Sequence, residues 1–267
     1  MNLVDHINLA YDVAYDRFVG RDLALFLLGS WIPDIYVCGI FERAETHQGG
    51  KQFVDYCERR KPRITPLARG ILFHQRVDDL FHDGYLEEKI DAVSRKTSSL
   101  DRTFFQKHAH GITELGGAFI EKTDISAKIK KALSYQVSEA NTYFSFLGKS
   151  IKDRFRTSLL LYMAKLFCRL RLFSSPGRQI NLDLIVNLFA LTLNRLRGKR
   201  VFRNRSSLSA LLMGSFYYLF TRERNLDNVE RLRRLVQLAK DELEKDYSQY
   251  CRSLKDKLQR KALYEQR

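Results

Sequence analysis

Apolar residues recur along the chain at the spacing of an α-helix, and strict alternation of apolar and polar residues is scarce. A repeat of three to four residues predicts helices with one buried face, whereas alternation would predict strands. Segments with the helical repeat occupy residues 4–18, 21–35, 52–60, 67–81, 100–122, 125–151, 154–173, 182–196, 207–220 and 225–263. The clearest loops are residues 174–177 and 197–205. The pattern therefore predicts an all-α fold.

Glycine and proline mark where some of these helices begin and end. Gly29 and Pro33 interrupt the apolar run that starts at Arg21, so the second helix is expected to stop there. Pro66 precedes the 67–81 segment and suits the first turn of a helix, where a backbone N–H is not needed.

Length and composition bound the class of protein. The chain has 267 residues, 45% of them hydrophobic, which is enough for one large domain or one domain with an extension. No window approaches twenty consecutive apolar residues, so no transmembrane span is expected. The first residues include acids where a signal peptide would have a basic stretch and an apolar run. The four cysteines form no Cys-x-x-Cys pair, which is typical of reduced thiols. We therefore expect a cytoplasmic protein.

The net charge of +15 is divided unevenly along the chain. The first 120 residues hold 15 Lys and Arg against 17 Asp and Glu, whereas the remaining residues hold 31 against 14. All 6 histidines lie at or before His110. We expect a metal-binding helical core over residues 1–150 and a basic helical extension, packed on that core, over residues 151–267.

Histidine and carboxylate side chains recur at helical spacing in two segments. His74 and Asp78 are four residues apart and His82 follows one turn later, so all three project near one helix face. His110 and Glu114 repeat this spacing on a second predicted helix. Imidazole and carboxylate donors arranged in this way suit zinc, and also manganese or iron.

Three upstream residues complete the candidate ligand set. His6 lies on the first predicted helix, Asp34 follows the second, and His47 lies in a glycine-flanked loop. One His–carboxylate pair at helical spacing is more often a solvated ion pair. Two such pairs, in the half of the chain that holds every histidine, favour a metal site.

The order of these residues resembles that of the zinc-dependent phospholipases C, whose helical fold is shared by the fungal-type single-strand nucleases. The resemblance covers about the first 120 residues and is carried by His6, Asp34 in LGSWIPD, His47, and the H-x-x-x-D and H-x-x-x-E pairs. It implies a multi-helix bundle in which zinc ions in a cleft hydrolyse a phosphodiester, here with a basic helical extension at the C-terminal side.

The resemblance also implies which residues hold which ion. The first ion would be bound by Asp34, His47, His74 and Asp78. The second ion would be bound by His82, His110 and Glu114. Asp78 would bridge to a third ion that His6 also binds, and an N-terminal tryptophan completes that third site in secreted members of the family. Because this sequence starts Met-Asn, a centre of two ions is expected, with Asp34 as the catalytic carboxylate that orients the attacking water.

Two of the same stretches resemble a second group, the acyl-carrier-protein phosphodiesterases, which are helical relatives of the HD-type phosphohydrolases. These stretches are MNLVDHINLA at the N-terminus and GILFHQRVDDLFH at residues 70–82. The Gly-x-x-x-His-x-x-Ile-Asp pattern of that group is matched by Gly70, His74, Val77 and Asp78, with valine in place of isoleucine. His47 and the H-x-x-x-E pair fit the phospholipase pattern better. Both resemblances imply metal-assisted hydrolysis of a phosphoester.

The basic half contains no histidine and no comparable ligand pair, so we expect it to act through its charge. Its densest group of cations is Arg197, Lys199, Arg200 and Arg203. The expected partners are anionic: a phosphoester substrate, the periphery of an anionic membrane, an acidic carrier protein or nucleic acid. The alternative is a non-enzymatic helical protein that binds an anionic partner through this half and carries a degenerate site in the other half.

Overall fold

The part of the chain that the structure describes is mostly helical. The computed structural model describes residues 3–33, 46–82, 84–118, 120, 126–132, 137–151, 154, 158, 161 and 222–264. No strand occurs among these residues, so the all-α prediction is confirmed. None of the helices in these ranges is long and apolar enough to cross a membrane.

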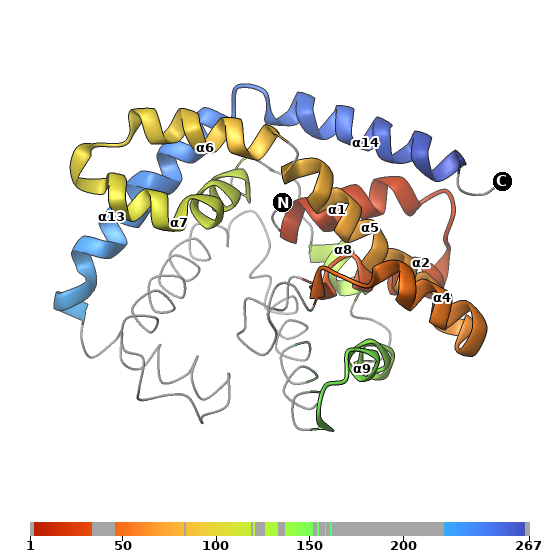
Figure 1. Ribbon diagram of the computed structural model, residues 1–267. Helices are drawn as coiled ribbons and strands as arrows, with labels where there is room; N and C mark the ends of the chain where they lie inside the picture. Colours follow the sequence, from red (N-terminus) through yellow and green to blue (C-terminus); the bar gives the residue numbers. More distant parts are fainter. Residues whose placement is uncertain are drawn as a thin grey trace.

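The helices follow one another along the chain as Figure 1 shows. They are α1 (Leu3–Ala14), α2 (Gly20–Gly29), α4 (Gly50–Arg60), the 3₁₀-helix η2 (Pro62–Ile64), α5 (Thr65–His82), α6 (Tyr85–Lys96), α7 (Ser99–Ala118), α8 (Ser126–Ala132), α9 (Val137–Phe146), α13 (Arg222–Leu243) and α14 (Tyr247–Tyr264).

Three parts of the prediction differ from the structure. The segment predicted as one helix over residues 125–151 contains α8 and α9, and α9 ends at Phe146, before a turn in which Gly148 has a φ of 71°. The predicted helices do not include α6, whose fully buried apolar contacts come from Leu86 and Val93. The segment predicted over residues 225–263 is divided into α13 and α14 by a turn at residues 244–246. The side chain of Asp246 in this turn accepts a hydrogen bond from Tyr85 of α6 at 2.8 Å. The predicted helices over residues 182–196 and 207–220 lie outside the described residues.

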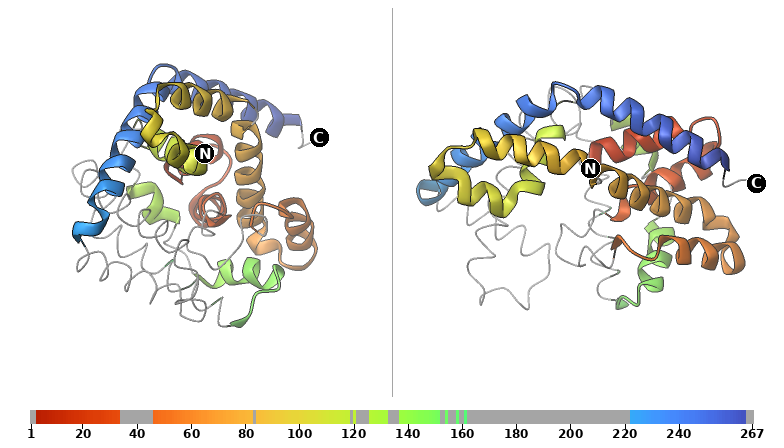
Figure 2. Two further views of the ribbon diagram at one scale, coloured as in Figure 1. Left: turned by 60° about the vertical axis from the view of Figure 1, so that its left-hand side comes forward. Right: turned by 45° about the horizontal axis from the view of Figure 1, so that its top comes forward.

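Six of the other α-helices pack around α5. It contacts α1, α2, α4, α6, α9 and α14, and its apolar face is covered, with Leu67, Ile71, Val77 and Phe81 at most 2% exposed. Figures 1 and 2 show α14 running along α1 and crossing the C-terminal end of α5, whereas α13 lies beside α6 and α7 at the other end of the molecule. The main core therefore surrounds α5, and a smaller apolar cluster joins α6, α7 and α13.

The backbones of α2 and α5 meet at two glycines. A Cβ atom on Gly29 would lie 2.1 Å from the carbonyl oxygen of Leu67, and one on Gly70 would lie 2.1 Å from that of Phe26. No larger residue fits at either position unless the helices separate, since backbone atoms cannot move aside as a side chain can. The crossing places the end of α2 against the third turn of α5, which carries His74.

The described part of the basic half packs on the first half through ion pairs as well as apolar contacts. Arg231 and Arg234 of α13 lie 2.7 and 3.4 Å from the two carboxylate oxygens of Asp101 in α7. Lys96 of α6 pairs with Glu242 of α13. Some of the charge of the basic half is therefore matched inside the fold.

Replacing Gly70 with alanine should destabilise the protein, because the added methyl group would push α5 away from α2. We expect the free energy of unfolding to fall by about 2–3 kcal/mol, measured by urea denaturation. Gly20→Asn is the control, because Gly20 has a φ of 54° with open space around it, and asparagine tolerates that backbone. An unfolding midpoint for Gly70→Ala equal to that of the unmodified protein would contradict the tight crossing.

Candidate metal centre

His74 is completely buried, and a backbone carbonyl orients its ring. Nδ1 lies 2.8 Å from the carbonyl oxygen of Ser30, just beyond α2, where a helix leaves carbonyl groups without internal partners. Because a carbonyl only accepts, Nδ1 carries the proton and donates it. In the neutral ring the lone pair is then on Nε2. Metal-binding histidines are usually oriented in this way.

His47 brings a second ring nitrogen to the same point. Its Nε2 lies 3.1 Å from Nε2 of His74 and 3.2 Å from Oδ2 of Asp78. Nε2 of His74 lies 3.9 Å from the same carboxylate oxygen. The other nitrogen of His47, Nδ1, lies 2.9 Å from the hydroxyl of Thr46. Two imidazole nitrogens and one carboxylate oxygen, from the loop before α4 and from α5, therefore converge.

His6 reaches this point from α1 and contacts the other oxygen of Asp78. Its Nε2 lies 3.0 Å from Oδ1 of Asp78, and it donates, since an ionised carboxylate only accepts. Its ring stacks on that of His74, with centroids 3.8 Å apart and planes inclined by 18°. Nδ1 of His6 is buried and has no hydrogen-bond partner among the described residues. In this geometry His6 positions Asp78, and the lone pair on its Nδ1 is unused.

Burial and mutual contact set the protonation states of these groups. Burial lowers the pKa of His6 and lowers the pKa of His74 well below its usual value, with the neighbouring ring of His6 adding to the effect at His74. Burial raises the pKa of the Asp78 carboxyl, but hydrogen bonds from His47 and His6 outweigh it and hold that pKa well below its usual range. The site therefore combines the neutral imidazoles of His6 and His74 with an ionised carboxylate, and metal coordination requires ligands in these protonation states.

This donor set fits a divalent ion. Donors about 2.0–2.2 Å from one zinc ion in tetrahedral arrangement stand about 3.3–3.6 Å from one another. The distances among His47, His74 and Asp78 are 3.1, 3.2 and 3.9 Å. His6, His74 and Asp78 also offer ligand atoms that all lie within 4.8 Å of one another. Nitrogen and carboxylate donors suit zinc, manganese or iron.

Two side chains that the sequence did not single out hold the loop that carries His47. Gln75 of α5 accepts a hydrogen bond from the N–H of Gly50 at 3.0 Å and donates one to the carbonyl of Thr46 at 3.4 Å. Tyr143 of α9 donates to the same carbonyl at 3.0 Å. A Cβ atom on Gly50 would lie 2.3 Å from Oε1 of Gln75, so this contact needs glycine.

A second group of ligand-type side chains lies at the end of α5. Nε2 of His82 lies 3.8 Å from Oε1 of Glu114, and the rings of His82 and His110 are 5.5 Å apart. Nε2 of His110 lies 3.5 Å from a carboxylate of α6, that of Glu87, and both side chains are 57% exposed. His82, Glu87 and His110 offer ligand atoms within 4.8 Å of one another. This group is far more open to solvent than the first.

Seven of the eight predicted ligands lie among the described residues, and each belongs to one of these two groups. The eighth, Asp34, lies outside the described residues. The same is true of the predicted anion-binding cations, Arg197, Lys199, Arg200 and Arg203. Glu87 was not predicted as a ligand, because the predicted helices do not include α6, which carries it.

Comparison with known proteins assigns no family to the chain. No protein-family model matches it, and no curated protein or solved structure matches it either. The chemistry of the site is therefore inferred from its own side chains.

Adding Zn²⁺ or Mn²⁺ to metal-free protein should raise its melting temperature, because an ion that binds only the folded state stabilises it by about 2.7 kcal/mol at a hundred times its Kd. The gain should disappear in Asp78→Asn, since an amide cannot supply an ionised oxygen. Asp79→Asn makes the same change at the exposed neighbouring residue and should keep the gain. An equal response in the two variants would contradict the site.

Gln75→Ala should weaken metal binding about 10–100-fold, the usual effect of removing a residue that supports a ligand. The loss would come from the freed loop of His47 rather than from a lost ligand. Isothermal titration with Zn²⁺ or Mn²⁺ measures it, and Gln106→Ala, an exposed position on α7, is the matched control. Unchanged affinity in Gln75→Ala would show that the loop does not need this contact.

Proposed function

We propose that this chain is a metal-dependent hydrolase of phosphodiesters. The observation that carries the proposal is the convergence of His47, His74 and Asp78 at one buried point. An ionised carboxylate is costly to bury, and a bound cation offsets that cost.

In such a site some side chains would bind the metal ion, and others would orient the side chains that bind it. A divalent ion held here would neutralise charge on a phosphate group and activate water for attack. His47 and His74 would bind it through Nε2, with the carbonyl of Ser30 keeping the second ring in the correct tautomer. Asp78 would supply the anionic ligand, and His6 would hold that carboxylate in place.

Specific contacts support each of the two family resemblances. The two stretches that resemble the acyl-carrier-protein phosphodiesterases meet through His6 and Asp78, and Gly70 of that pattern lies at the crossing with α2. The phospholipase C resemblance is supported by the position of His47 beside Asp78 and by the nearness of His82 to the α7 carboxylate. Both lead to the same reaction.

The substrate class follows from the reaction and the charge of the chain. A phosphodiester is anionic, and the net charge of +15 attracts anions. The range of this attraction becomes shorter as the salt concentration rises. A phospholipid headgroup and a phosphodiester on an acidic carrier protein both have this chemistry. The proposal does not depend on the cationic segment at residues 197–205, which was predicted as a loop and lies outside the described residues.

Hydrolysis of bis-p-nitrophenyl phosphate by the metal-loaded protein tests the proposal directly. Asp78→Asn should lower kcat by at least about 100-fold, because the ion provides several kcal/mol of charge stabilisation in the transition state. Asp79→Asn should remain near the unmodified rate. A protein that binds the ion yet hydrolyses neither this diester nor a monoester would favour the non-enzymatic alternative.

His110→Ala distinguishes the two resemblances in the same assay. The phospholipase C pattern uses His110 as a ligand of a second ion, whereas the carrier-protein phosphodiesterase pattern does not include it. A loss comparable to that of Asp78→Asn would support a centre of two ions. Retained activity would support a centre confined to the buried group.

A further inference from the structure

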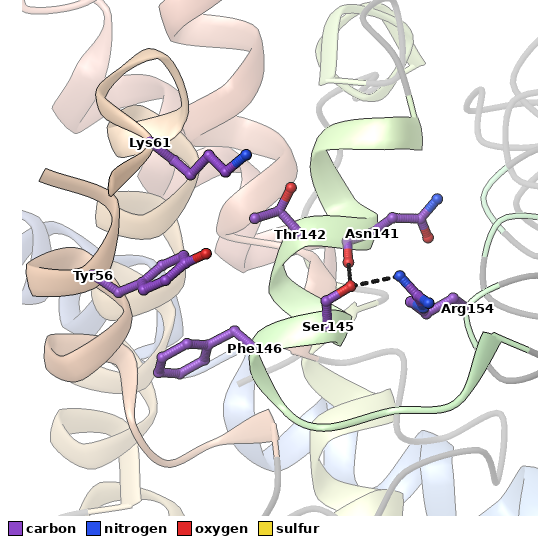
Figure 3. A pocket seen from close by; sticks show the side chains of 7 residues that line it. All are labelled: Tyr56, Lys61, Asn141, Thr142, Ser145, Phe146 and Arg154. Carbon is purple, nitrogen blue, oxygen red and sulfur yellow. Dashed lines mark hydrogen bonds between the residues drawn. The ribbon is translucent and has the colours of Figure 1, made fainter. Parts of the chain in front are cut away.

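A cavity of about 460 Å³ opens between the end of α4 and α9. Tyr56 and Lys61 line it from the end of α4, four residues line it from α9, and Arg154 lies beyond Ser145 (Figure 3). Its volume lies within the range of small-molecule sites, about 300–1,000 Å³. None of the seven candidate metal ligands that the structure describes lines it, so it is separate from the centre described above.

Two cations with unused donors line this cavity. Among the described residues, the ammonium of Lys61 has no ion-pair or hydrogen-bond partner. Nη1 of Arg154 donates to the hydroxyl of Ser145 at 2.7 Å, while its buried Nε has no acceptor among the described residues. A guanidinium has five N–H donors, so within the described part of the chain most of those of Arg154 are unused. The described residues that line the cavity include no carboxylate to neutralise either charge.

The rest of the lining provides one polar group and an apolar wall formed by two aromatic rings. Thr142 makes no side-chain hydrogen bond with any described residue and presents a free hydroxyl between the two cations. The rings of Tyr56 and Phe146 lie 5.5 Å apart, inclined by 42°, and form the apolar wall. Aromatic side chains in this arrangement favour flat ligands.

We propose that this cavity binds a small organic anion. Its phosphate, phosphonate or carboxylate group would lie between Lys61 and Arg154 and accept hydrogen bonds from both cations and from Thr142. Its flat apolar group would pack against Tyr56 and Phe146. The site requires no metal ion, so it is independent of the proposed hydrolase activity.

Phenylphosphonate is a suitable probe, because it carries both groups and has no ester bond to hydrolyse. Titration of the chelator-treated full chain, followed by calorimetry, should show saturable binding that is tighter than that of inorganic phosphate or phenol. Lys61→Gln and Arg154→Gln should each weaken it about tenfold, since each removes a charge-assisted hydrogen bond. Thr142→Val keeps the shape of the side chain and should weaken it less.

Arg59→Gln is the matched control, because it removes an equal charge two residues from Lys61 at an exposed position that does not line the cavity. Melting curves of all variants confirm folding. An equal loss in Arg59→Gln and Lys61→Gln would overturn the proposal in favour of general charge attraction. Binding that is lost in Asp78→Asn but intact in Lys61→Gln and Arg154→Gln would overturn the proposal by placing the phosphonate at the metal centre. An absence of saturable binding to the unmodified protein would overturn it too.

Discussion

The close crossing of α2 and α5 is the constraint on which the candidate centre depends. Because Gly29 and Gly70 have no side chains, the two backbones touch, and the carbonyl of Ser30 reaches Nδ1 of His74. Larger residues would move that carbonyl away, and His74 would lose the hydrogen bond that sets its tautomer. The crossing also buries the apolar faces of both helices. Stability and ligand geometry thus depend on the same pair of residues.

The helix α9 takes part in both the candidate metal centre and the neighbouring cavity. Tyr143 holds the loop of His47 through a backbone carbonyl, while Phe146 lines the cavity. Phe53 of α4 lies 5.0 Å from each of these two aromatic rings and packs between the two regions. A ligand in the cavity would therefore contact the helix that supports a metal ligand, which gives the two sites one shared structural element.

The helical class and most helix positions could be predicted, because the spacing of apolar residues is a local property. The predicted segment 67–81 agrees with α5 to within a few residues. The break between α13 and α14 could not be predicted in the same way. At that turn Asp246 accepts a hydrogen bond from Tyr85, a contact between residues far apart in the sequence. Apolar spacing shows which face of a helix is buried, but not which helix covers it.

The same distinction holds for the candidate site: proximity within one helix could be predicted, and contacts between helices could not. The sequence by itself determined that His74 and Asp78 are neighbours, since residues four apart share one face of a helix, and it identified His6 as a further candidate ligand. Only the tertiary structure decided that His6 positions the carboxylate of Asp78 while stacking on His74. It also brought His110 to Glu87 on another helix. Distances within one helix follow from its repeat, whereas contacts between helices follow from how the helices pack against one another. At the crossing of α2 and α5, two glycines decide how closely the backbones approach, and this approach brings the carbonyl of Ser30 to His74.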